Sequence, residues 1–294
     1  MRSDYCSAVY YFQDNTFDHL RRTATMVDPN RRHVLFACGA AATGLAGCAF
    51  PGVLESEQTS EEVSIPAETP IRVTNRNGDV TIEDDGGDTA TLEIRKSTRY
   101  GADLFDQVTV QTGVEDEQFH VEMVDDTLPG QSVSVDLTLY LPADVPVDSV
   151  RTDNGDVQVV DVPGDATLRT TNGDVRADGV DGFLTLRSGN GDLTARSITG
   201  LDGARTINGD IDVAIPSIRG DTRIETTNGD VRVAVPEDLD AVVELRTTNG
   251  DVGVSGLDFE RSVDRSRRIR GTLGSGGDEL TAVSTNGDVR VRPL

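Results

Sequence analysis

The side chains of this sequence that could do chemistry are almost all carboxylates. The 294-residue chain holds 51 aspartate and glutamate residues but only three histidines and three cysteines. Paired carboxylates can cleave glycosidic bonds, and carboxylates from adjacent turns can bind calcium. A catalytic site would break a regular pattern locally. The aspartates here recur at one fixed place in a repeat, which predicts a structural role for most of them.

A repeated tripeptide contains many of these aspartates. Asn-Gly-Asp occurs eight times between Asn77 and the end of the chain, and four consecutive copies are 18 residues apart. Similarity at a fixed period of about 20 residues is typical of stacked rungs. Glycine adopts positive φ at a corner without steric cost, and asparagine tolerates the left-handed region. The predicted structural turns are Asn154, Gly155, Asp156, Asn172, Gly173, Asp174, Asn190, Gly191, Asp192, Asn208, Gly209, Asp210, Asn228, Gly229 and Asp230.

The segments between these turns have the pattern of short strands. Apolar residues alternate with polar ones, as in Val157, Gln158 and Val159, so each strand has one buried face. Stacking identical corners predicts an all-β fold, a parallel β-solenoid with two short strands in each rung of roughly 18 residues, and an irregular β region before it. Asn-Gly is also a two-residue hairpin turn, which leaves an antiparallel meander or sandwich as the alternative.

The beginning of the chain resembles an export signal. Residues 1–25 contain no long apolar stretch, and we interpret them as an extension upstream of the true start. Residues 26–47 carry the pair Arg31 and Arg32 and then an apolar run, which resembles a twin-arginine lipoprotein signal peptide. The resemblance implies cleavage before Cys48 and lipid attachment to its thiol. An ordinary secretory peptide or a short membrane anchor is the alternative.

The rest of the chain divides by composition. Residues 48–62 are rich in Glu, Ser, Thr and Pro and are predicted to form a solvated acidic tether. The β-strand-repeat domain is predicted over 63–294. Within it, 81–147 is irregular and could cap the stack, and 148–294 holds the regular repeats with a basic insertion at 258–280.

The charge balance excludes some partners and suggests an environment. The formal net charge is −24, and Lys96 is the single lysine. Such a surface stays soluble at molar salt, where the Debye length is about 3 Å. We therefore interpret the chain as halophilic and archaeal, with a GC-rich genome as the alternative. The charge also argues against nucleic acid as a partner. The insertion has a basic cluster, Arg261, Arg265, Arg267, Arg268 and Arg270.

That basic cluster has two interpretations. As a loop whose arginines lie against the acidic rungs, it would be structural. As a binding loop, it could contact an acidic surface polymer or a neighbouring copy of the chain.

Catalytic motifs are missing from the sequence. All three cysteines lie at or before residue 48, and His120 is the one histidine after it. Because His120 falls in the alternating strand 118–124, we predict an exposed strand residue rather than a general base. We therefore predict no enzyme, no catalytic residue and no cofactor. The turn aspartates weakly match calcium-binding nonapeptide repeats, which leaves calcium at those turns as an alternative.

Three segments carry a resemblance to a known family. They are 71–82 (IRVTNRNGDVTI), 148–157 (DSVRTDNGDV) and 170–176 (TTNGDVR). Together they resemble the β-strand-repeat family of bacterial and archaeal surface proteins labelled as adhesins of unknown function. The resemblance covers about 63–294 and implies a solenoid-like all-β domain outside the cytoplasm. It supplies no catalytic residues.

The leading hypothesis is a lipid-anchored protein on the outer face of the cytoplasmic membrane. Its solenoid would bind a surface glycan or protein, or organise the cell surface. The closing strand at 289–291 lies near the chain end, and its edge could pair with another chain. Two alternatives are an accessory or sensor protein of an envelope-stress system and a carboxylate-based polysaccharide lyase or glycosidase.

Overall fold

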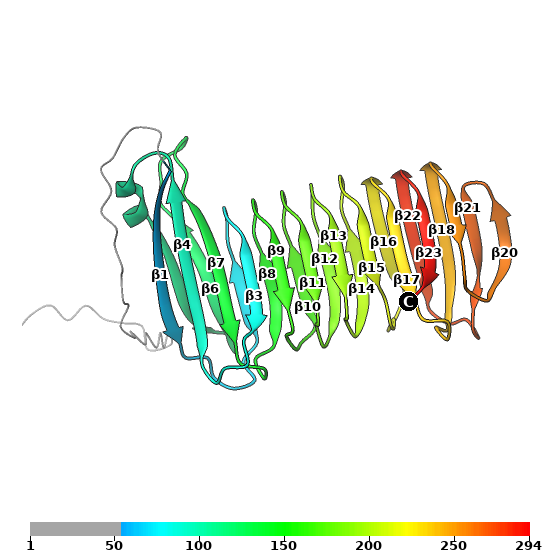
Figure 1. Ribbon diagram of the computed structural model, residues 1–294, viewed down its shortest axis with the longest axis horizontal. Coiled ribbons are helices and arrows are strands. Elements are labelled where there is room, and N and C mark those ends of the chain that lie inside the picture. The colour runs from blue at the N-terminus through cyan, green and yellow to red at the C-terminus, as the bar shows by residue number, and fades with distance from the viewer. Residues whose placement is uncertain (1–53) are drawn as a thin grey trace, which may run out of the picture. The chain divides into compact units, whose positions relative to one another are not determined.

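A computed structural model describes residues 54–294 as a stack of strands in two sheets (Figure 1). The predicted upstream extension, signal segment and lipidation site at Cys48 lie outside the described residues. The first sheet, sheet A, has the strand order β1 (Glu55–Val63), β4 (Ala90–Thr98), β7 (Ser134–Leu141), β3 (Val80–Asp84), β9 (Val157–Val160), β11 (Val175–Asp178), β13 (Leu193–Arg196), β15 (Ile211–Ala214), β17 (Val231–Val235), β23 (Val289–Pro293) and β19 (Val252–Val254).

The second sheet, sheet B, faces sheet A across the core. Its order is β20 (Phe259–Arg265), β21 (Arg268–Leu273), β18 (Ala241–Asn249), β22 (Glu279–Asn286), β16 (Thr222–Asn228), β14 (Gly200–Arg205), β12 (Phe183–Arg187), β10 (Ala166–Arg169), β8 (Val147–Arg151), β2 (Ile71–Thr74), β6 (Gln118–Asp125) and β5 (Val108–Glu115). A 3₁₀ helix, η1 (Ala102–Gln107), precedes β5.

The centre of the stack is the predicted parallel β-solenoid. Each turn contributes one strand to sheet B and the next to sheet A, and neighbouring turns pair in parallel. Asn154 forms a parallel bridge to Asn172, which lies 18 positions later. The antiparallel alternative is therefore wrong for the centre and applies only to strands near the two ends.

A single apolar core fills the space between the sheets. Every second side chain of a strand points into the core. Val157, Leu168 and Val175 are fully buried, whereas their neighbours along the strands face solvent. Equivalent residues of successive turns lie directly above one another, as Leu168 does with Leu186. The core is consequently a set of apolar columns that continues from one end of the stack to the other.

The Asn-Gly-Asp corners stack through side chains as well as backbone. Seven of the eight asparagines donate from Nδ2 to the Oδ1 of a neighbouring asparagine at 2.7–2.8 Å, and these bonds join all eight in one ladder. Beside it, the backbone N–H of Asp174 donates to Asp156 Oδ1 at 2.8 Å, and other rungs repeat this bond. Inside the corner, the Thr170 hydroxyl donates to the Gly155 carbonyl at 2.8 Å. The repeat thus provides hydrogen-bond partners between the corners of neighbouring rungs.

The amino-terminal end corrects one prediction. Residues 55–62, predicted as part of a solvated tether, belong to strand β1, which pairs antiparallel with β4 along its whole length. The segment alternates enough to turn Thr59, Glu61 and Val63 partly or fully inward. Glu57 lies opposite Lys96, so the pairing also brings opposite charges together. An acidic edge strand of this kind discourages pairing with other chains.

The carboxyl-terminal end departs most from the expected order. Strand β22 lies between β16 and β18, and β23 lies between β17 and β19, so the last turn is inserted between two earlier turns. Figure 1 shows these red strands between yellow and orange ones. The prediction that the closing strand 289–291 has a free edge is wrong, because β23 is hydrogen-bonded on both sides. The edge strands at this end are β19 and β20.

The basic insertion forms a hairpin and not the predicted loop. Strands β20 and β21 extend sheet B beyond β18. The prediction that its arginines lie against acidic residues is confirmed for two of them. Glu244 of β18, only 2% exposed, accepts from Arg268 Nε at 2.8 Å and from Arg270 Nη1 at 2.5 Å, and it also pairs with Arg246. Arg270 reaches Glu279 of β22 as well.

This cluster makes stability depend on pH. Burial opposes ionisation of Glu244, but the surrounding guanidinium groups outweigh it and hold the pKa of this carboxyl below its ordinary value of 4.5. A lowered pKa in the folded state stabilises the fold above the unfolded pKa, and this contribution is lost as pH falls through the folded pKa.

We expect Glu244→Gln to lower the free energy of unfolding by about 1–3 kcal/mol at neutral pH. The difference from the parent chain should shrink as pH falls below 4.5, the ordinary carboxyl value. Denaturant unfolding between pH 3 and 7 measures it, with the exposed Glu237→Gln as control. A pH-independent difference would contradict the assigned role.

Candidate functional site

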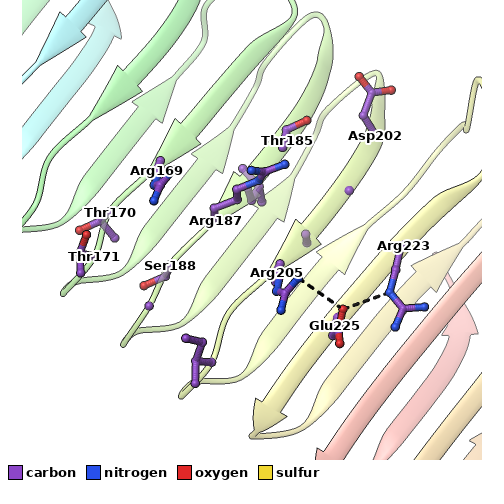
Figure 2. A pocket seen from close by; sticks show the side chains of 15 residues that line it. Arg169, Thr170, Thr171, Thr185, Arg187, Ser188, Asp202, Arg205, Arg223 and Glu225 are labelled. Atoms are coloured by element: carbon purple, nitrogen blue, oxygen red, sulfur yellow. Dashed lines mark hydrogen bonds and ion pairs between the residues drawn. The ribbon is translucent and has the colours of Figure 1, made fainter.

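An exposed column of arginines runs across sheet B. Arg151, Arg169, Arg187 and Arg205 lie in register on the parallel strands β8, β10, β12 and β14, each on the outer face. Parallel strands are about 4.8 Å apart, so the four positions span about 14 Å along the stack. Figure 2 shows Arg169, Arg187 and Arg205 on successive strands. We call these four residues the arginine column.

Three members of the column, Arg169, Arg187 and Arg205, line an open groove of about 650 Å³. Hydroxyl side chains flank the arginines, with Thr185 on one side and Thr171 on the other. Ile207 is the exposed apolar residue of the lining, at 51% exposure, and no aromatic side chain takes part. The groove is therefore rich in cationic and hydroxyl side chains and open to a ligand that lies along the surface.

Carboxylates of the same chain neutralise only some of the charges of the arginine column. At one end, Arg151 pairs with Asp153 at 3.0 Å. At the other end, Arg205 approaches Glu225 at 4.0 Å, and Glu225 also receives a hydrogen bond from Arg223. Among residues 54–294, no carboxylate forms an ion pair with Arg169 or Arg187. The two central guanidinium groups thus remain available to an anion from outside.

Several arginines elsewhere on the solenoid show the contrasting arrangement. On sheet A, Arg176 pairs with Asp174 at 2.6 Å and with Asp156 at 3.5 Å. Arg232 likewise bridges two turn aspartates. At a corner, Arg219 pairs with two aspartates and lies over the ring of Phe183, 4.2 Å from its centroid. These arginines are occupied in holding rungs together, whereas the centre of the column is not.

Arginines stacked on adjacent strands repel one another, and a bound anion would remove this unfavourable energy. Guanidinium groups directly opposite each other on adjacent strands repel, and a bound anion would turn the repulsion into attraction. The arrangement can therefore bind carboxylate, sulfate or phosphate groups in a row.

The column was not predicted from the sequence, in which the densest basic cluster is the one between Arg261 and Arg270. The periodic signal was present, since each member stands three residues before a ladder asparagine, at 18-residue intervals. Its face follows from the alternation of each strand. What the sequence does not reveal is which arginines find carboxylate partners.

The turn aspartates Asp156, Asp174, Asp192, Asp210 and Asp230 each bond to a neighbouring rung. Each turn aspartate uses one oxygen to accept a backbone N–H of the neighbouring rung, and Asp174 gives its other oxygen to Arg176. No group of three or more His, Cys, Asp or Glu side chains within residues 54–294 is arranged to hold a metal ion. His120 lies on β6, partly exposed, and its Nε2 is hydrogen-bonded to the Glu115 carbonyl.

Comparison with known proteins places the fold in a family. Residues 50–292 match the family described as Toastrack DUF4097. The chain belongs to this toastrack family. No curated protein matches the toastrack chain.

Several solved structures resemble it. A candidate cell adhesion protein from Clostridium sporogenes is 12% identical, with 82% of this chain and 100% of that one covered and a TM-score of 0.39. A candidate adhesin from Parabacteroides distasonis is 13% identical over 80% and 97% of the two chains, with a TM-score of 0.43. A candidate lipid-binding protein from the same organism is 14% identical over 81% and 96%, with a TM-score of 0.39.

The part of the toastrack chain that the structure describes contains no helix that is long and apolar enough to cross a membrane.

Proposed function

We propose that this toastrack chain is a non-enzymatic binding protein of the cell surface, acting in adhesion or in organising the envelope. The observation that carries the proposal is the arginine column. It is an exposed and partly unneutralised cationic row on a chain of net charge −24. A structural arginine in such a chain has many carboxylates available to it, and Arg176 and Arg232 use them.

The proposed location is the outer face of the cytoplasmic membrane. The resemblance of residues 26–47 to a twin-arginine lipoprotein signal supports export, and Cys48 supplies the thiol for a lipid. Strand β1 begins at Glu55, so a lipid on Cys48 would hold the solenoid close to the membrane surface. The acidic surface suits a saline medium outside the cell.

The arrangement of the carboxylates disfavours the glycosidase and lyase alternative. Catalytic carboxylates must be free to hold a proton or attack a sugar carbon. The turn aspartates of the central rungs are instead occupied as hydrogen-bond acceptors of neighbouring rungs, as Asp156 is for Asp174. No feature of the described residues favours the envelope-stress sensor over a binding protein.

Replacement of the lipidated thiol tests the location. We expect the parent chain in the membrane fraction and accessible to protease added to intact cells. Cys48→Ala should appear in the soluble extracytoplasmic fraction, because one lipid modification is removed. Cys38→Ala, within the apolar run, is the matched control and should remain with the membrane. Membrane retention of Cys48→Ala, or protection of the parent chain from protease, would count against the proposal.

A further inference from the structure

We propose that the arginine column binds a linear acidic glycan whose carboxylate or sulfate groups follow the stack axis. The inference rests on the proposed surface-binding function and names the ligand class for it. The site comprises Arg169 and Arg187 at its centre, with Arg151 and Arg205 at its ends.

Geometry favours a linear ligand. The four arginines occupy matching positions on adjacent parallel strands, so their side chains start from a row that crosses the strands. A compact anion could satisfy one or two of them, whereas a chain with repeated acidic groups could contact the whole row. The groove lined by Arg169, Arg187 and Arg205 is open to solvent, which suits a polymer that lies along it.

The flanking residues suit the neutral parts of a glycan. Ser149, Thr167 and Thr185 are stacked in register beside the arginines, two positions earlier on each strand. Their hydroxyls face the outer side of the sheet and can both donate to and accept from sugar hydroxyls. Thr171 lies on the other side of the row. Arginine and hydroxyl columns together therefore match a ligand that alternates acidic and hydroxyl groups.

The same lining disfavours single-stranded nucleic acid. Proteins that bind single strands combine a basic groove with aromatic side chains that stack on the bases. No aromatic residue lines this groove.

The test measures binding of defined polymers to the full chain at fixed ionic strength. The probes are polygalacturonate, dextran sulfate, uncharged dextran and poly-glutamate. The variant is Arg169→Gln with Arg187→Gln, and the matched control is Arg176→Gln with Arg232→Gln, which removes the same charge from the opposite sheet. Unfolding curves are recorded for every protein.

We expect the acidic glycans to bind and dextran not to bind. The column variant should lose about tenfold in affinity for each arginine removed, since charged hydrogen bonds are lost. Its unfolding midpoint should not fall, because repulsion within the row is relieved. The control should retain its affinity while its midpoint falls, because Arg176 and Arg232 hold rungs together.

Three results would overturn the inference. Equal losses of affinity in variant and control would mean unspecific attraction. Preferred binding of poly-glutamate through the column would assign an acidic protein segment as the ligand. Failure of both acidic glycans to bind would remove this ligand class, while the proposed surface location would still stand or fall by the Cys48 fractionation.

Discussion

Replacement of Gly191 by alanine is expected to lower the free energy of unfolding by about 3–5 kcal/mol. Gly191 has φ +151, a conformation that residues with a Cβ rarely adopt. A Cβ at this position would overlap the carbonyl oxygen of Gly173 in the rung below. That carbonyl cannot move freely, because it accepts the Ser188 hydroxyl at 2.9 Å. The strain would therefore pass to the rungs on both sides.

Denaturant unfolding of Gly191→Ala and of a matched glycine variant measures the effect. Gly113→Ala on β5 is the control, because a Cβ there meets nothing within 4 Å and its φ is not in the left-handed region. The control should be neutral or slightly stabilising, since alanine restricts the unfolded chain. A Gly191 variant as stable as the Gly113 variant would show that the stacked corners can separate.

The corner could be predicted from sequence because its determinants are local. Asparagine, glycine and aspartate recur together, and each forms its bond with its own counterpart in a neighbouring rung. The alternation of apolar and polar residues then determines that the Val157 side chain faces the core and the Gln158 side chain faces solvent. The hydrogen bonds of each corner, the alternation of each strand and the period of the repeat all favour the same fold, so the solenoid could be predicted.

The order of the rungs was not predictable in the same way. Identical corners can stack on one another in any spatial order. The 37-residue interval between Asn249 and Asn286 therefore fits a final rung at the end of the stack or one inserted between earlier rungs. Strand β21 occupies the outer edge of β18. The last turn can therefore pair with β18 only at its inner edge, between β18 and β16. This constraint arises from the hairpin, whose pairing has no repeat to indicate it.

The acidic segment before the domain shows a second limit of composition. A run of Glu, Ser and Thr is typical of a solvated linker, yet β4 provides an open edge with Lys96 and Arg95 opposite β1. Nine backbone partners in register outweigh the weak strand propensity of glutamate. The open edge of β4 therefore makes this segment a strand, and the composition of the segment does not reveal that edge.

Because the last turn is inserted between earlier turns, a core substitution in β23 should destabilise the fold strongly. The same substitution in a strand at the end of the stack would have a small effect. Val289 begins β23 near the chain end, but it is fully buried and paired with Val231 on one side and Val252 on the other. We expect Val289→Asp to lower the free energy of unfolding by more than about 4 kcal/mol, because it places a carboxylate in a closed apolar column.

Thr285→Asp is the matched control, since Thr285 is exposed on the adjoining strand β22 and the change in charge is the same. Its effect should stay within about 0.5 kcal/mol. Hydrogen exchange of Val289→Asp should show lost protection in both β17 and β19, because β23 joins them. If β23 were an appended strand with one free edge, it would fray alone, and β17 and β19 would keep their protection.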